Sequence, residues 1–316
     1  MTLEKAFSLA IILVALVFTS VGQTRRQIAI TIDDLPVVST RTDLKTRQNI
    51  TRKLLAHIKR ERVPAIGFVN ENKLYEDGKL DEQQVALLRS WLKAGLELGN
   101  HTYSHRSLNT ISLEDYEADL LRGEAVTKRL LDERNRPLRY FRHPFLQTGR
   151  TMEKKERFAT FLADHGYKIA PVSIDNADYI FSRAYDNAFD KHDKEMMKKV
   201  GSAYVPYMEA KLEYWERQSM KLFGREIGQI LLIHANFINS DHLADLIKMF
   251  RRRGYDIVSL DTVLKDDAYR LPDEYVGPAG ISWLHRWALK QGRDFVIPDE
   301  PKVPDFVLKV SGFDSE

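Results

Sequence analysis

The 316-residue sequence contains no cysteine. This absence excludes disulfides, thiol nucleophiles and cysteine-ligated zinc, so any metal ion must be bound by His, Asp or Glu. A charge excess is also missing, since 48 Lys and Arg residues oppose 45 Asp and Glu residues. No stretch shows the clustered basic residues of a nucleic-acid-binding protein, so we expect no nucleic-acid partner. With 43% hydrophobic residues, the composition is that of an ordinary globular protein with a sizeable core.

A hydrophobic run long enough to cross a bilayer is lacking as well. The N-terminal apolar run, Ala6–Phe18, is shorter than the ~20 residues that a membrane-spanning helix needs. A lysine precedes it, and Ser20 and Gly22 place small residues before a cleavage site at Gln23. We therefore predict that residues 1–22 are a signal peptide and that the mature protein is exported, periplasmic or secreted, without a stable membrane span. An uncleaved N-terminal anchor is the alternative.

Short apolar runs alternate with longer amphipathic stretches along the rest of the chain. This alternation is typical of βα units around a parallel sheet, and favours a barrel or an open doubly wound sheet. In either architecture, functional residues follow the carboxyl ends of the strands. The predicted strands are 28–32, 65–69, 96–98, 138–141, 168–174, 229–233 and 257–260. The predicted helices are 43–61, 81–94, 113–135, 152–165 and 240–253.

Two adjacent carboxylates follow the first predicted strand. Asp33 and Asp34 come directly after the run 28–32, and Pro36 stops the strand. Neighbouring residues on a strand point to opposite sides, so we expect the two aspartates to have different roles. An ordinary acidic turn is the alternative.

The third predicted strand leads into two histidines spaced four residues apart. His101 and His105 would share one face if a helical turn follows the strand. Together with Asp34 they form a cysteine-free ligand set that suits Zn or a similar divalent ion and leaves positions open for water and substrate. Two ordinary polar histidines are the alternative.

Ionisable residues also follow three further predicted strands: Arg142, the pair Asp175 and Asp178, and His234. A charge beside a buried strand is costly unless it is paired, so we expect each to have a partner. Five such strand ends indicate one active site, whereas independent capping residues are the alternative.

These residues lie in five motifs whose order resembles that of the polysaccharide deacetylase superfamily, also called the NodB-homology fold or carbohydrate esterase family 4. The resemblance implies an irregular (β/α) barrel of about seven strands. It extends over residues 28–262, and we place the catalytic domain at 23–264 and a C-terminal wrapping extension at 265–316. The motifs are Thr31–Asp34, His101–His105, Arg142–Phe145, Asp175–Tyr179 and Leu232–His234.

The resemblance also implies which residues bind the metal and which move protons. Asp34, His101 and His105 would bind one divalent ion, with Zn expected and Co, Ni or Mn as alternatives. Asp33 would be the base and His234 the acid. Such a division suits amide hydrolysis, which needs an activated water, oxyanion stabilisation and a proton for the leaving amine.

Other residues of the motifs would support this chemistry. Arg142 would orient Asp33 and keep it ionised, and Asp178, with Asp175 as a competing candidate, would raise the pKa of His234. The backbone N–H of Phe145 would assist at the oxyanion. Tyr179 and Leu232 would line a small acetyl pocket.

The predicted function is therefore removal of N-acetyl groups from an amino-sugar glycan, chitin-like or peptidoglycan, by hydrolysis of a non-peptide C–N bond. Four residues differ from the usual family pattern and alter the walls of the predicted pocket: Ile32, His143, Phe145 and Tyr179. These differences leave hydrolysis of another small amide or ester as an alternative. A non-catalytic secreted carbohydrate-binding protein is the alternative outside enzymes.

Two segments outside the five motifs also have predicted structures. We expect a helix from Tyr204, with Pro206 near its start, whose broad apolar face packs in the core; a lid over the site is the alternative. In the C-terminal extension we expect a helix over 281–290 and an extended tail that wraps the barrel. Trp283 and Trp287 are predicted to be buried anchors rather than a sugar-stacking edge, and His285 to be structural.

Overall fold

The computed structural model describes residues 26–292 and 299–316. The predicted signal peptide lies outside these ranges. In the described part of the chain, no helix has the length and apolar character needed to cross a membrane.

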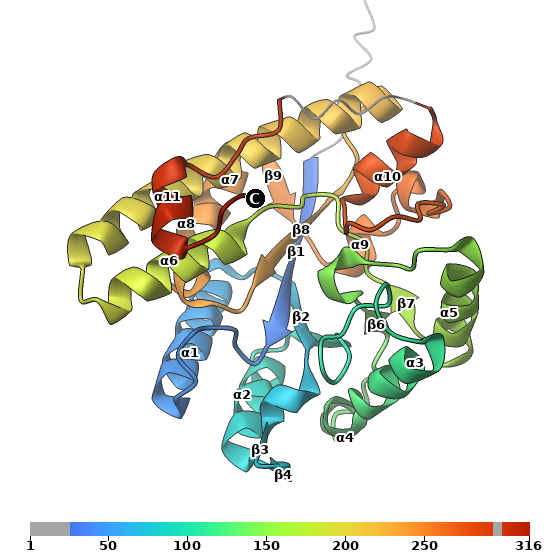
Figure 1. Cartoon of the computed structure of the whole chain (residues 1–316), viewed down its shortest axis with the longest axis horizontal. Coiled ribbons are helices and arrows are strands. Elements are labelled where there is room, and N and C mark those ends of the chain that lie inside the picture. Colours follow the sequence, from blue (N-terminus) through green and yellow to red (C-terminus); the bar gives the residue numbers. More distant parts are fainter. Residues whose placement is uncertain (1–25, 293–298) are drawn as a thin grey trace, which may run out of the picture.

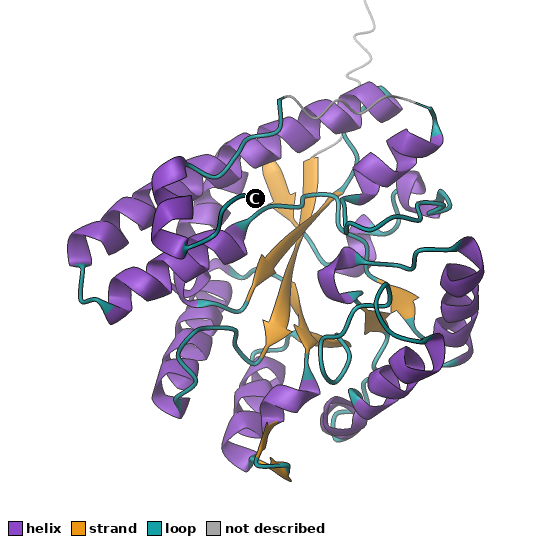
Figure 2. Cartoon of the chain, viewed as in Figure 1, coloured by secondary structure: helices purple, strands orange, loops and turns teal. Residues whose placement is uncertain are grey.

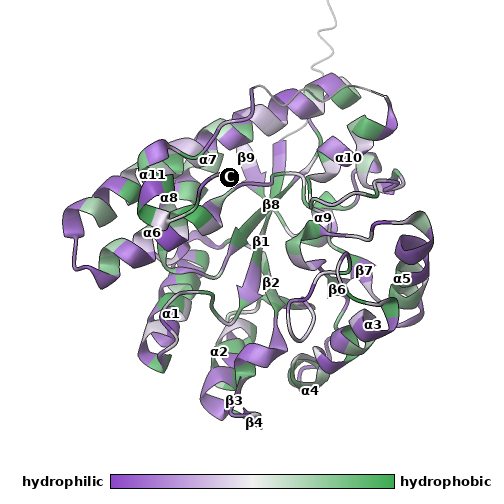
Figure 3. Ribbon diagram, viewed as in Figure 1, coloured by the Kyte–Doolittle hydropathy of each residue, from purple (hydrophilic) through white to green (hydrophobic). Residues whose placement is uncertain are grey.

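A parallel sheet forms the centre of the fold, and helices surround it (Figures 1 and 2). The strand order is β7-β6-β5-β2-β1-β8, and β9 pairs with the start of β1. The central strand β1 is almost fully buried on both faces, as expected when helices cover both sides of a parallel sheet. Hydrophobic residues accordingly gather on the central strands and on the helix faces turned toward them (Figure 3). The strands are β1 (Arg26–Leu35), β2 (Ala65–Val69), β5 (Glu97–Asn100), β6 (Tyr140–Phe141), β7 (Lys168–Ile169), β8 (Gln229–His234) and β9 (Tyr255–Ile257).

The segment predicted as one strand over 168–174 instead joins the two edges of the sheet. Residues 168–169 form β7 and pair with β6, whereas Ile174 pairs with Leu231 of β8. Pro171 lies between them and has no N–H to donate to a ladder, which accounts for the interruption. The segment thereby curls the sheet into an irregular (β/α) barrel, and the predicted fold class is confirmed.

Four predicted helices are found close to their expected bounds: α1 (Leu44–Glu61), α2 (Glu82–Lys93), α5 (Met152–Asp164) and α8 (Phe237–Arg252). The helix predicted over 113–135 is divided into α3 (Leu113–Arg122) and α4 (Ala125–Asp132). Gly123 accounts for the division, because a Cβ there would lie 2.4 Å from the backbone of the loop carrying the two histidines. Buried Glu71 then accepts hydrogen bonds from two backbone amides at the start of α4.

Short elements that follow β2 and β9 were not predicted. A 3₁₀ helix, η1 (Glu71–Leu74), and a hairpin of β3 (Tyr75–Glu76) and β4 (Lys79–Leu80) follow β2. The strand predicted over 257–260 is too long, since β9 ends at Ile257 and α9 (Leu260–Val263) follows. The side chain of Ser259 caps α9 by accepting from the amide of Thr262, which ends the extended conformation.

The region before β8 holds two long helices, α6 (Asp178–Asp190) and α7 (Lys194–Phe223). The prediction that a helix starts near Tyr204 is wrong, because Asp193 caps α7 further upstream and Pro206 lies inside the helix. The predicted packing role is confirmed: Tyr204, Tyr207 and Leu212 of α7 are buried in the core. Helix α6 itself was not predicted.

The C-terminal extension packs against these two helices. Its elements are η3 (Asp267–Arg270), α10 (Trp283–Lys290) and α11 (Asp305–Ser311), and the last of these replaces part of the predicted extended tail. Helix α10 contacts α7, and α11 lies along α6 (Figure 1). Trp283 and Trp287 are 5% and 3% exposed and are buried anchors, as predicted. His285 is buried against Tyr214 of α7, which agrees with a structural role.

A buried lysine attaches the last residues to the barrel. The Lys211 side chain on α7 is 2% exposed and forms ion pairs with Glu300 at 2.6 Å and Glu316 at 2.8 Å. Glu316 also accepts from the Tyr207 hydroxyl and from the amide of Val303. These contacts fix residues 299–316 across one side of the barrel.

We expect Lys211→Met, which preserves volume but removes the charge, to lower the free energy of unfolding by about 2 kcal/mol, measured by urea denaturation. The loss stays moderate because the two carboxylate side chains are 22% and 25% exposed and can be hydrated. Lys128, which is 57% exposed and pairs with Glu124 at 3.5 Å, provides a control, and Lys128→Met should change stability by less than about 0.5 kcal/mol. Equal effects of the two substitutions would contradict this anchoring role.

Candidate active site

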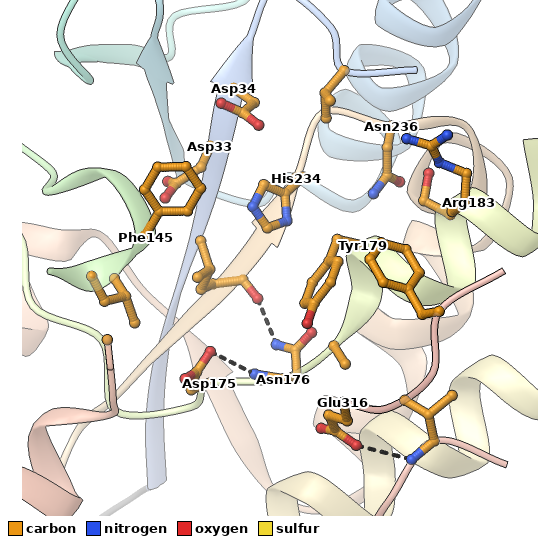
Figure 4. Close-up of a pocket in the computed structure, with 18 of the residues that line it drawn as sticks. Asp33, Asp34, Phe145, Asp175, Asn176, Tyr179, Arg183, His234, Asn236 and Glu316 are labelled. Atoms are coloured by element: carbon orange, nitrogen blue, oxygen red, sulfur yellow. Dashed lines mark hydrogen bonds between the residues drawn. The ribbon is translucent and has the colours of Figure 1, made fainter. Parts of the chain in front are cut away.

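A cavity of about 1010 Å³ opens where β1 and β8 end (Figure 4). Most of the predicted site residues line it, from the ends of β1, β5, β6 and β8, the loops that follow them, and α6. Arg142 and Asp178 do not line the cavity; both are fully buried behind it, where they contact Asp33 and His234. The predicted residues that line it are Asp33, Asp34, His101, His105, Phe145, Tyr179, Leu232 and His234.

The two aspartates at the end of β1 both face the cavity. The pairing of β1 with β2 shifts register between Ile32 and Leu35, and Asp34 has a φ of 68°. This irregularity interrupts the alternation that would have turned one carboxylate away, as bulges near active sites do. The carboxylates lie 3.8 Å and 4.0 Å from the same atom, Nε2 of His101.

Asp34, His101 and His105 form a set that fits a divalent metal ion. One potential ligand atom from each lies within 4.8 Å of the others. Oδ1 of Asp34 is buried and lies 3.6 Å from Nε2 of His105. Nδ1 of His101 bonds to the Arg142 carbonyl oxygen at 2.8 Å, which leaves Nε2 turned toward Asp34.

The two histidines are held by a loop rather than by the expected helical turn. Thr102 and His105 have φ values of 65° and 56°, and the Thr102 hydroxyl accepts from the His105 amide. Burial lowers the pKa of both His101 and His105, so each ring is neutral near pH 7. Neutral imidazole is the form that binds metals.

Sequence reasoning missed a cation beside this set. Nζ of Lys73, from η1, lies 3.3 Å from Oδ1 of Asp34 and 3.0 Å from its carbonyl oxygen. Burial alone would raise the pKa of Asp34, but Lys73 and His105 together lower it below the usual range. The only available signal was the position of Lys73 shortly after the second predicted strand.

Asp33 is 2% exposed and is held from behind by Arg142. Nη1 of Arg142 lies 3.4 Å from Oδ2 of Asp33, while its other nitrogens donate to the Ala170 carbonyl and the Thr31 hydroxyl. Burial raises the pKa of Asp33 and the arginine lowers it, with a net rise to about 6. Asp33 is therefore ionised above pH 6, and its Oδ1 accepts no hydrogen bond from the described residues.

His234 is paired with Asp178 and not with Asp175. Nδ1 of His234 lies 2.7 Å from Oδ1 of Asp178, whose other oxygen accepts from the His234 amide and from Asn236 and Asn239. Burial acts to lower the pKa of His234, but Asp178 outweighs it and raises the pKa to about 9. Between about pH 6 and 9 the site therefore holds an ionised Asp33 opposite a protonated His234.

The remaining predicted residues form the walls of the cavity. The Phe145 ring is 56% exposed and packs edge-on against His105, with a centroid distance of 4.4 Å. Tyr179 on α6 packs edge-on against Phe313 from the C-terminal tail, and Leu232 is buried on β8. Helix α6 and residues 299–316 thus contribute a wall that the sequence motifs did not indicate.

A family match accompanies this geometry. Residues 20–169, just under half of the chain, match the model of a family described as polysaccharide deacetylase, and this match supports the predicted relationship to the polysaccharide deacetylase superfamily. No curated protein sequence matches the chain significantly.

Solved structures share the fold at low sequence identity. One is the Bc1960 peptidoglycan N-acetylglucosamine deacetylase bound to a naphthalenyl N-oxidanyl-benzamide, with 17% identity over 76% of this chain and 88% of that one and a TM-score of 0.50. Another is peptidoglycan deacetylase PdaC from Bacillus subtilis, with 19% identity, 86% and 98% coverage and a TM-score of 0.47. A third is BA3943, a family 4 pseudoenzyme from Bacillus anthracis, with 15% identity, 76% and 66% coverage and a TM-score of 0.46. The similarity to Bc1960 bears on the fold alone.

We expect Asp178→Asn to lower the pKa of His234 from about 9 to below its ordinary value, because burial then acts without the opposing carboxylate. An NMR titration of the His234 ring in chelator-treated protein measures the shift. The folded-state pKa lies above the unfolded value of ~6.5, so this ion pair stabilises the wild type fully below pH 6.5 and progressively less up to pH 9.

Asp175→Asn is the matched control for this titration. Asp175 lies on the same loop, and its Oδ1 accepts from the amide of Asn176 rather than from His234. The pKa of His234 should therefore stay near 9 in this variant. A shift in Asp175→Asn without one in Asp178→Asn would contradict the assignment.

Proposed function

We propose that this protein is a metal-dependent hydrolase that removes acetyl groups from N-acetylated amino sugars of a glycan. One observation carries the proposal: β1 and β8 pair so that Asp33 lies opposite His234, beside the Asp34, His101 and His105 set. An ionised base and a protonated acid on two sides of a metal-ligand set are the groups that amide hydrolysis requires.

Asp34, His101 and His105 would hold the metal ion, and zinc is the proposed ion because the set offers one carboxylate and two neutral imidazoles. A bound ion of this kind activates a water molecule and polarises a carbonyl oxygen. The chain's own groups would carry out the proton transfers. Oδ1 of Asp33, which is free of hydrogen bonds from the described residues, would accept a proton, and Arg142 would hold the other oxygen in place.

His234 would supply the proton for the leaving amine. Its Nδ1 is bonded to Asp178, so Nε2 is the atom that would donate into the cavity. The proton is transferred as the C–N bond breaks, because the unprotonated nitrogen would be a very poor leaving group. The Phe145 amide would assist as an oxyanion donor, and Tyr179 and Leu232 would surround the acetyl group.

The proposed substrate is a chitin-like or peptidoglycan glycan outside the cytoplasm, since the N-terminal sequence has the features of an export signal. A binding protein without turnover would need neither the buried Arg142 behind Asp33 nor the Asp178 partner of His234. Both buried charges are costly to maintain, which favours a catalytic use.

Purified protein should release acetate from N-acetylated chitooligosaccharides or peptidoglycan fragments when loaded with Zn or Co, measured by an enzyme-coupled acetate assay. Absence of acetate from a broad panel of such glycans at full metal occupancy would refute the substrate class. Release of acetate or another acid from small amides or esters would then favour the alternative hydrolase. Glycan affinity without any turnover would instead favour the alternative of a non-catalytic carbohydrate-binding protein.

Substitution of the metal ligands should separate them from the base. Asp34→Ala, His101→Ala and His105→Ala should each lower both metal content and activity, because each removes one ligand. Asp33→Asn should retain the metal and lose activity by a factor on the order of 10² or more, because only the proton acceptor is lost. Elemental analysis of the variants is the deciding measurement. Equal metal loss in Asp33→Asn would show that both aspartates are ligands.

A further inference from the structure

Helix α6 places one arginine, Arg183, at the cavity without an ion-pair partner among the described residues. Arg183 is exposed, lines the cavity, and forms no ion pair or side-chain hydrogen bond with any residue in 26–292 or 299–316. It lies four residues after Tyr179, so both side chains project from the same face of the helix. Figure 4 shows Arg183 beside Asn236, on the same side of His234 as Tyr179.

The acidic residues that could have paired with Arg183 along α6 have other partners. Asp186, three residues further along the helix, accepts hydrogen bonds from the Ser39 hydroxyl and the Thr40 amide. Asp190, one turn beyond, pairs with Arg41 at 2.9 Å. The loop before α1 therefore occupies Oδ2 of Asp186 and the Asp190 carboxylate, while Oδ1 of Asp186 is buried without a partner among the described residues. Neither carboxylate forms an ion pair with Arg183, so its guanidinium remains available to a ligand.

The position of Arg183 relates it directly to the proposed acid. Asp178 begins α6 and holds His234, and five residues along a helix correspond to an axial distance of about 7.5 Å. This separation is comparable to the size of one sugar ring plus a substituent. A group bound by Arg183 would thus lie about one sugar ring from the amine that His234 would protonate.

The surrounding charges make this position selective. Lys211 also lines the cavity, but Glu300 and Glu316 neutralise it. Lys302 lines the cavity from the segment before α11. Asp175 and Asp305 line the cavity as well and would repel an anion. Among the described residues, Arg183 and Lys302 are therefore the cavity cations without an acidic partner, and Arg183 is the one on the helix that carries Tyr179 and Asp178. An anionic group bound there would fix the orientation of the ligand.

We propose that Arg183 is a specificity-determining residue that binds a carboxylate carried by the glycan substrate. A planar guanidinium matches a carboxylate through two parallel N–H···O bonds. The inference rests on the proposed function for the glycan part of the ligand. It goes further by selecting acidic amino-sugar glycans over neutral ones.

Calorimetric binding to the Asp33→Asn variant, which should bind without turnover, tests the proposal. The ligands are a disaccharide of N-acetylglucosamine and N-acetylmuramic acid, one of glucuronic acid and N-acetylglucosamine, and neutral N,N′-diacetylchitobiose. Adding Arg183→Gln should weaken binding of at least one acidic disaccharide by about 10- to 100-fold, the usual effect of losing a charge-assisted pair. Binding of the neutral disaccharide should change less than twofold, and Arg183→Lys should restore part of the affinity.

Lys191→Gln is the matched control, because Lys191 follows α6 immediately, is exposed, and does not line the cavity. It should leave all three affinities unchanged. Equal weakening for acidic and neutral ligands, or none for either acidic one, would overturn the role of Arg183. If acetate is released from neutral glycans while Arg183→Gln has no selective effect, only this inference fails. If no glycan yields acetate but Arg183-dependent binding persists, only the proposed function fails.

Discussion

The parallel pairing of β1 with β8 is the constraint on which the site depends. It sets Asp33 opposite His234 in a fixed register, at a point where both strands are covered by helices. Two charges cannot be brought this deep without partners, so Arg142 and Asp178 must lie behind them, themselves fully buried. Each partner is in turn held by backbone and side-chain groups of neighbouring strands and loops, including the Ala170 carbonyl and Asn239. The packing around this strand pair therefore also determines which charged groups of the site have partners.

Burial disfavours the charged form of both central groups, so it raises the pKa of Asp33 and acts to lower the pKa of His234. It raises the pKa of Asp33 despite Arg142, whereas Asp178 overcomes burial to raise that of His234. The result is a carboxylate that gives up its proton readily at neutral pH and an imidazolium that keeps one. Environments that assign different protonation states to neighbouring groups are what acid and base catalysis needs. Arg142 is therefore better described as limiting the rise in the pKa of Asp33 than as lowering it.

Much of the barrel and the identity of the clustered residues could be predicted from the sequence, because apolar runs ending in ionisable residues are a local signal. Interactions between segments that are distant in the sequence have no such local signal and could not be predicted. Pro171 interrupts one predicted strand, but the pairing of Ile174 with β8 depends on the closed barrel. The joint orientation of Asp33 and Asp34 depends on a register shift against β2. Lys73 and α6 reach the cavity only through the path of the chain around it.

The pairing of β1 with β8 also has a consequence for folding. The two strands are separated by most of the chain, and the closing contact between Ile174 and Leu231 needs both to be present. During synthesis from the N-terminus, β1, β2, β5 and β6 can assemble the aspartates and histidines around Arg142 before β8 leaves the ribosome. In that interval one edge of β1 is an exposed, apolar strand edge beside buried acidic groups, a species prone to aggregation. Arrival of β8 thus brings His234 opposite Asp33 and covers this edge in a single step.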